Sequence, residues 1–199
     1  MLSTLSSVKA RLAIPDLNVE FDDLLTTALA ALSARFELET NRTLTRTANT
    51  THEFDACETE IIPPCYPIES VSKFETKSTE TEGWVQQSRI DYLIKRSTVI
   101  SLVTPLSTTG QSGSDLSTSR VTYTGGYVMP GDTPGAGQTP LPPDLEQAAV
   151  EQVAYWFQNR DKLGLLRYWP KDGIYLQLSG ADLLPSVSAV LLKYRRWVV

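Results

Sequence analysis

Helical sequence patterns stand at both ends of this chain and enclose a long stretch with the pattern of β-strands. This order constrains the fold more than any single motif, because helices with one apolar stripe each must be buried against one another. We therefore expect an α+β protein that is mainly helical: a small bundle of two N-terminal and two C-terminal helices with an inserted antiparallel β lobe. The 199 residues form a single domain in this prediction, with a helical frame at 1–44 and 140–199 and the β lobe at 45–130.

Two helices are predicted near the N-terminus. Thr4 caps a short first helix, Leu5–Leu12, and Pro15 stops it. The second helix begins at Asp22 or Asp23 and ends at Asn41, a residue type that tolerates the left-handed conformation. Apolar residues at helical spacing predict its inward face, which is formed by Leu25, Ala28, Leu29, Leu32 and Phe36.

The middle of the chain is rich in Thr, Val, Ile and Tyr and is broken by Pro, Gly and Ser, which is typical of short strands. Two polar loops interrupt it, Ser107–Ser119 and Pro130–Pro143, and loops of this size are often functional or mobile. They could be contact arms that become ordered only in an assembly. The predicted strands are Thr45–Phe54, Ile68–Thr76, Trp84–Ile94, Val99–Val103 and Ser119–Thr124.

Two further helices are predicted after the second loop. Asp144 and Gln147 resemble a capping box at the start of the first, which ends near Arg160. An irregular stretch follows and includes a short strand at Ile174–Leu178. Pro185 suits the first turn of the last helix, whose inward residues are predicted to be Val187, Val190, Leu191 and Tyr194.

Known catalytic and ligand-binding motifs are missing from the sequence. His52 is the sole histidine and has no nucleophile-elbow pattern to serve, and it is predicted to lie on a surface or edge strand. The spacing of Cys57 and Cys65 fits neither zinc fingers nor catalytic zinc sites. The pair Gly125-Gly126 lacks the Lys of a phosphate-binding loop and is interpreted as a turn or bulge. We expect no catalytic, cofactor-binding or metal-binding residues and no enzyme activity, although paired carboxylates are defined by spatial distance and cannot be judged from sequence.

Charge and apolar patterning restrict the partners. The net charge of −5 argues against a general nucleic-acid binder. Residues 1–159 carry 11 basic and 20 acidic side chains, whereas residues 160–199 carry seven basic and three acidic ones. Such a chain could attract copies of itself, or simply have two solvated faces. No apolar run reaches the roughly 20 residues that span a bilayer, and we expect synthesis in a cytoplasm with both cysteines reduced.

The C-terminal segment is the most pointed local feature, because it is amphipathic, basic and aromatic at once. One interpretation is a helix that docks into a partner's groove. A second is contact with nucleic-acid phosphates, and a third is a final helix packed on its own core with its cations near the C-terminal end of the helix dipole. The candidate docking residues are Leu191, Lys193, Tyr194, Arg195, Arg196 and Trp197.

An ordered series of segments resembles the head–tail connector proteins of long-tailed phages, which are also called head-completion or adaptor proteins. The resemblance covers nearly the whole chain, with departures in the loops at 104–119 and 130–141 and in the segment 163–182. The segments that carry it are Leu5–Leu12, Phe21–Leu25, Thr40–Leu44, Pro67–Val71, Val121–Tyr127, Leu141–Leu145, Asn159-Arg160, Leu184-Pro185 and Leu191–Arg196.

The resemblance implies a structural virion protein that forms an oligomeric ring, commonly of twelve copies, between the portal and the downstream neck or tail components. Its partners would be other copies of itself, the portal protein, and a stopper or tail-completion protein. DNA would pass through the channel without sequence-specific binding, and no membrane is involved. A related alternative is another neck, tail-terminator or tail-assembly protein of the virion.

Overall fold

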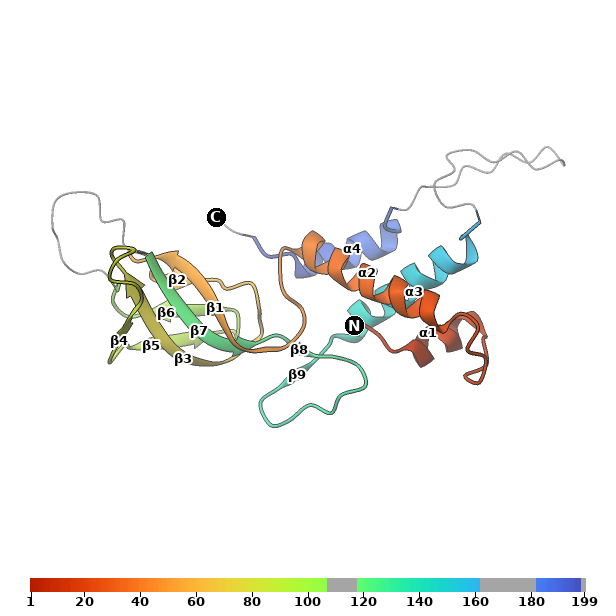
Figure 1. Cartoon of the computed structure of the whole chain (residues 1–199), viewed down its shortest axis with the longest axis horizontal. Coiled ribbons are helices and arrows are strands. Elements are labelled where there is room, and N and C mark those ends of the chain that lie inside the picture. The colour runs from red at the N-terminus through yellow and green to blue at the C-terminus, as the bar shows by residue number, and fades with distance from the viewer. Residues whose placement is uncertain (107–117, 162–181, 198–199) are drawn as a thin grey trace. The chain divides into compact units, whose positions relative to one another are not determined.

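The structure is a computed structural model of the chain, and the described residues form two compact units (Figure 1). The described residues are 1–106, 118–161 and 182–197. The helical unit comprises Met1–Thr40, Met129–Asp132 and Leu141–Arg195. The β unit comprises Asn41–Val128, Thr133–Pro140 and Arg196–Val199. The predicted single-domain organisation stays a prediction.

Apolar packing holds the helical unit together. Its helices are α1 (Leu5–Leu12), α2 (Asp22–Thr40), α3 (Pro143–Gln158) and α4 (Pro185–Tyr194). In this unit α3 contacts α1, α2 and α4, and α2 also contacts α1 and α4. The core side chains are at most 4% exposed, so each Val, Leu and Phe among them contributes roughly 1.5–3 kcal/mol through burial. They are Val8, Leu25, Leu29, Leu32, Phe36, Leu145, Ala149, Val153, Val187 and Leu191.

Local signals explain where the first two helices begin and end. The Thr4 hydroxyl caps α1 by accepting a hydrogen bond from the Ser7 amide at 3.2 Å. Ala13, at a φ of 55°, ends α1 before Pro15 is reached. Asp22 and Asp23 lie in the first turn of α2, where the helix dipole favours their negative charges. Asn41, at a φ of 52°, follows the last turn as predicted.

The start of α3 differs from the prediction. The N-cap is Pro142, no side chain caps the helix, and Asp144 already lies inside the first turn. The capping-box prediction is therefore wrong, because Pro143 at the first helical position sets the start instead. The buried Gln152 of α3 accepts a hydrogen bond from the Leu184 amide at 2.8 Å, which fixes the entry to α4.

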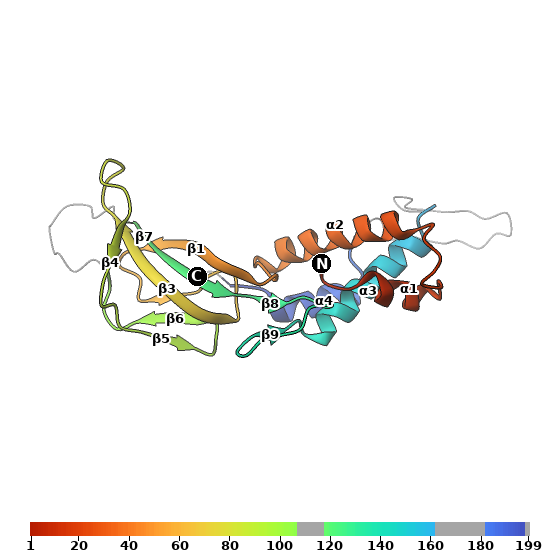
Figure 2. The same cartoon turned by 60° about the horizontal axis from the view of Figure 1, so that its bottom comes forward.

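Two antiparallel sheets and one short parallel pair form the β unit. One sheet has the strand order β1-β7-β3-β4 and the other β2-β6-β5, while β8 pairs with β9 in parallel (Figure 2). Side chains from both antiparallel sheets form one core around Phe54, Phe74, Ile100 and Tyr123. The strands are β1 (Thr47–Asp55), β2 (Glu60–Ile61), β3 (Ile68–Lys77), β4 (Val85–Gln87), β5 (Tyr92–Lys95), β6 (Val99–Leu102), β7 (Thr118–Gly125), β8 (Tyr127–Val128) and β9 (Thr139–Pro140).

The end of β7 is a crowded backbone crossing, in agreement with the predicted turn or bulge at the two glycines. A Cβ atom on Gly125 would lie 2.6 Å from the carbonyl oxygen of Cys65. Gly126 has a φ of 100°, and a Cβ atom there would lie 2.7 Å from the carbonyl oxygen of Thr45. Glycine is required at both positions because the surrounding atoms belong to the backbone and cannot shift to make room for a Cβ atom without disturbing the fold.

Two predictions about the β region are wrong. The described residues contain 32% helix and 28% strand, so the protein is α+β with a substantial sheet and is not mainly helical. The predicted strand Trp84–Ile94 is two strands, β4 and β5, which belong to different sheets. Arg89 between them adopts a φ of 62°, which breaks an extended strand.

Several predicted features lie outside the described residues. These are most of the loop Ser107–Ser119 and the strand Ile174–Leu178. Among the helices of the described ranges, none is both long and apolar enough to cross a membrane.

Candidate functional site: the C-terminal segment

The C-terminal segment predicted for docking is divided between the two units. Helix α4 runs to Tyr194 and belongs to the helical unit, and Arg195 is extended with a φ of −65° and a ψ of 130°. From Arg196 onward the chain is grouped with the β unit. Of the six candidate residues, Leu191, Lys193, Tyr194 and Arg195 thus belong to the helical unit, and Arg196 and Trp197 belong to the β unit.

Two of the candidates hold the helical unit together. Leu191 is 4% exposed and packs in the core. The Tyr194 hydroxyl donates a 2.6 Å hydrogen bond to the carboxylate of Asp144 in the first turn of α3. These contacts agree with the interpretation of α4 as a helix packed on its own core, in which Leu191 is buried and Tyr194 partly buried.

Arg196 is bound to a backbone carbonyl of the β unit. Its Nε and Nη2 atoms donate hydrogen bonds of 2.9 and 2.6 Å to the carbonyl oxygen of Ile62, just after β2. Arg196 lines a cavity of about 400 Å³ together with His52, Glu53 and Phe54 of β1, and with Glu58 and Glu60. The sequence separates His52 from Arg196 by more than 140 residues, so no local signal could have indicated this pairing.

Burial of the imidazole and, next, the nearby positive charge of Arg196 lower the pKa of His52 to about 4. His52 is consequently neutral near pH 7. It lies on β1, an edge strand of the four-stranded sheet, as predicted. The described residues that line the cavity beside His52 include no Ser, Thr or Cys, and the contact between Arg196 and Ile62 attaches the C-terminal segment there.

Three candidates remain accessible: Lys193, Arg195 and Trp197. Trp197 is 67% exposed, and the neighbouring Leu192 of α4 is 58% exposed. Arg195 and Leu192 border a small cleft of about 130 Å³ that also contains Glu39 at the end of α2. The basic and apolar surface that Arg195 and Leu192 form on the helical unit suits contact with a protein partner.

No metal centre is indicated by the described parts of the chain, which contain no group of three or more His, Cys, Asp or Glu residues that could hold an ion. Cys57 is exposed, Cys65 is buried, and both are free thiols as expected. The Sγ atom of Cys65 donates to the carbonyl oxygen of Gly125 at 3.1 Å, which indicates a structural role.

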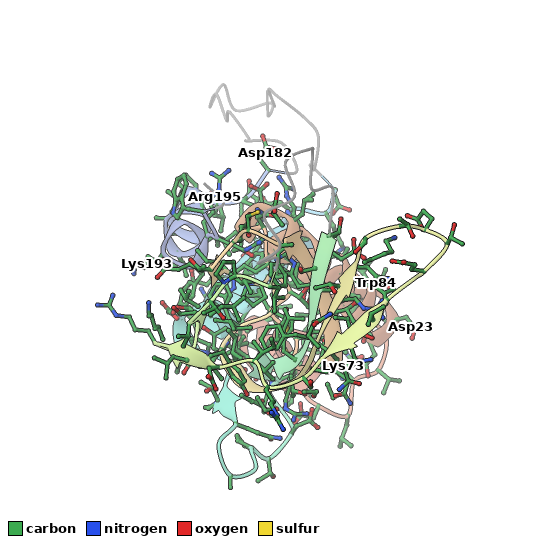
Figure 3. All side chains as sticks on the ribbon, turned by 90° about the vertical axis from the view of Figure 1, so that its left-hand side faces the viewer. Asp23, Lys73, Trp84, Asp182, Lys193 and Arg195 are labelled. Atoms are coloured by element: carbon green, nitrogen blue, oxygen red, sulfur yellow. The ribbon has the colours of Figure 1, made fainter. Side chains whose placement is uncertain are left out.

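An ion cluster on the four-stranded sheet was not predicted from the sequence. The Arg120 side chain donates to the Glu75 carboxylate at 2.7 Å, and this bond, aided by Lys73, lowers the pKa of Glu75. The Arg120 guanidinium lies 4.2 Å from the ring centre of Trp84, which is labelled with Lys73 in Figure 3. Glu75 therefore binds two cations, Lys73 of its own strand β3 and Arg120 of β7, and the second of these ion pairs links the two strands.

The fold is similar to chains in solved structures of gene transfer agent particles. A chain from the neck of the empty particle, computed with C6 symmetry, aligns with a TM-score of 0.58 at 16% identity, over 100% of this chain and 91% of that one. A chain from the virion of the native particle gives 0.55 at 16% identity, with coverage of 100% and 91%. A chain from the neck of the native particle, computed with C12 symmetry, gives 0.52 at 17% identity, with coverage of 99% and 94%.

Comparisons of the sequence find no family model that matches the chain and no curated protein that matches it. At 16–17% identity the structural likeness is one of fold. It extends over the whole chain, including both the helical unit and the β unit.

Proposed function

We propose that this chain is a structural virion protein, a head–tail adaptor that forms a ring in the neck between the portal and the downstream neck or tail components. The observation that carries the proposal is the fold likeness to neck chains of gene transfer agent particles, which spans 99–100% of this chain. Those neck structures were computed with C6 and C12 symmetry, which supports a cyclic arrangement, and we propose twelve copies. The proposal assigns no catalysis to the protein.

The remaining parts of the proposal concern partners and DNA. The ring would be made by copies of this chain, seated on the portal and followed by a stopper or tail-completion protein. The formal net charge of −5 supports a channel through which DNA passes without strong binding. Assembly would take place in the host cytoplasm, and the finished protein would reside in the neck of the virion.

Binding to the cognate portal tests this function. The full-length protein, mixed with purified portal rings, should co-sediment as a complex whose mass in native mass spectrometry corresponds to a ring of subunits on the portal. A protein that never binds the portal, but binds a purified tail tube or terminator ring, would place the chain elsewhere in the virion. Failure to bind any head, neck or tail component would overturn the proposal.

The accessible end of the chain is the part that we propose to contact the portal. Replacing Trp197 by Ala together with Arg195→Glu should reduce portal binding at least tenfold, because an exposed aromatic side chain and an exposed cation are removed. The matched control is Arg11→Glu, which reverses the charge of another exposed basic residue of the helical unit. Both proteins should keep the wild-type circular dichroism spectrum, and equal portal binding by the two would contradict this role of the segment.

A further inference from the structure

Helix α2 is apolar on two opposite sides. Its inner side is buried in the helical core. On the other side lie exposed residues that alternate at spacings of three and four, and we call them the outer stripe: Leu24, Thr27, Ala31, Ala34 and Leu38. Leu24 is 50% and Leu38 81% exposed. A helix that is apolar on both sides is normally buried on both, which indicates that something covers the outer stripe.

The outer stripe continues into an apolar groove between α2 and α3. Leu24 and Ala28 line it from α2, Trp156 and Phe157 line it from the last turn of α3, and Arg160 lines it from just after that helix. Its volume is about 310 Å³. In the middle of the stripe the small side chains of Ala31 and Ala34 allow another helix to approach to the short end of the usual 8–10 Å axial distance. The surface is therefore shaped for a helix with an apolar and small-residue face.

Helix α4 of the same unit has an exposed face of that kind. Ala189, Leu192 and Lys193 lie on it, opposite the buried Val187 and Leu191. Figure 2 shows α2 along one side of the helical unit, with α4 on the other side of it. In Figure 3, Asp23 of α2 and Lys193 of α4 are likewise labelled on opposite sides of the molecule. One chain thus presents two different surfaces facing in different directions.

The charges of the two surfaces are complementary. Helix α2 carries four acidic side chains and one basic one, whereas residues 185–195, which form α4 and its C-cap, carry two basic side chains and no acidic one. In a cyclic ring each copy uses one surface toward one neighbour and a different surface toward the other. Opposite charges on two such surfaces favour a head-to-tail contact and disfavour a contact of either surface with itself.

We propose that the outer stripe of α2 binds the exposed face of α4 from a second copy of this chain. The proposal rests on the ring arrangement proposed above and adds the residues that form the contact. Ala31 and Ala34 lie at its centre, Leu24 and Leu38 at its two ends, and Lys193 of the second copy adds a charge contact to the acidic helix.

Mixed cysteine variants test the contact in the assembled protein. All variants carry Cys57→Ser, which removes the exposed native thiol. The Ala31→Cys and Ala189→Cys proteins are mixed, assembled on cognate portal rings and oxidised. We expect a disulfide-linked dimer from the mixture and at least tenfold less from either protein alone. Ala30→Cys, on the same exposed part of α2 but beside the stripe, replaces Ala31→Cys in the control mixture and should give little dimer.

Each other outcome would overturn the proposed contact. A dimer from Ala31→Cys alone would mean that the stripe meets its own counterpart. A link to a different protein would mean a different occupant. Protection of the Ala31→Cys thiol from maleimide before assembly would mean that the chain covers its own stripe, and absence of any link in complexes that form would mean that the ring uses other surfaces. If no complex with the portal forms, the proposed function fails instead, and co-sedimentation distinguishes the two failures.

A substitution provides an independent test. Ala31→Arg places a large cation where Lys193 of the second copy would approach, so the yield of complete rings should fall at least tenfold. Ala30→Arg is the matched control and should assemble normally. Both positions are exposed on a helix, so the thermal midpoints of the two unassembled proteins should be equal. Equal ring yields for the two variants would contradict the proposal.

Discussion

The two units differ in the interactions that their polar and apolar side chains make. In the β unit, polar groups bind one another: Arg46 donates two hydrogen bonds of 2.8 and 2.9 Å to Glu69, and the guanidinium of Arg42 stacks 3.5 Å from the ring centre of Tyr66. In the helical unit, a full stripe of α2 presents apolar and small side chains to solvent. We therefore expect changes of side-chain size inside the β unit to lower its stability. In the helical unit, we expect changes on the exposed stripe of α2 to affect assembly.

The largest expected effect is that of Gly126→Ala in the β unit. The new Cβ atom would meet the Thr45 carbonyl oxygen at 2.7 Å, at a φ of 100°, so we expect a loss of about 3 kcal/mol or more of folding free energy. Gly137→Ala is the control, since Gly137 also has a positive φ but no atom within 4 Å of the new Cβ, and about 1–2 kcal/mol is expected. Urea unfolding measures both, and equal losses would show that the crossing is not tightly packed.

A smaller effect is expected from Tyr123→Phe. The Tyr123 side chain is fully buried, and its hydroxyl accepts a 3.1 Å hydrogen bond from the Cys65 amide. Removal of the hydroxyl leaves that amide buried without this partner, at a cost of about 1–3 kcal/mol. Tyr92→Phe keeps the ring contact with Phe74 and should change the urea midpoint much less. Equal midpoints for the two variants would mean that the hydrogen bond does not support the β core.

The smallest expected effect concerns pH. The pKa of His52 is about 4 in the folded protein and about 6.5 in an unfolded chain. Between these values the unfolded state binds more protons, so the free energy of unfolding falls as the pH is lowered from 6.5 to 4. Because His52 is only partly buried, its share should be about 1 kcal/mol, and His52→Gln should remove it from the pH profile.

The same histidine reports on the C-terminal segment. As the chain contains one histidine, its NMR titration gives the pKa of His52 directly. Arg196→Gln should raise this pKa, because a positive charge beside the imidazole is lost. An unchanged pKa would mean that Arg196 does not stay at the Ile62 carbonyl in solution.

Much of the helical unit could be predicted because its ends are marked by residues with fixed conformational preferences. Thr4, Asn41 and Pro185 each stand where a helix begins or ends. The start of α3 was predicted wrongly, since a side-chain cap and a proline compete there and the proline decides. The second side of α2 also escaped prediction, because small residues between distant leucines give no periodic hydrophobic signal.

The β unit was harder to predict because its strands are short and are held by distant partners. The two residues of β2 pair with β6, some forty residues away, and no local pattern indicates such a pairing. The break between β4 and β5 depends on a positive φ at Arg89, and an arginine in the sequence does not indicate a positive φ. The site at Arg196 was predicted only as part of a docking segment, and its attachment to Ile62 depends on tertiary structure alone.

Cryo-electron microscopy of particles that carry a tagged copy of this protein tests the central claim most directly. We expect extra density in a closed ring at the neck, between the portal and the next component, into which the helical and β units can be fitted. Particles with complete necks that lack the protein, or a tag located only in the capsid shell or the distal tail, would show that the protein is not a neck component.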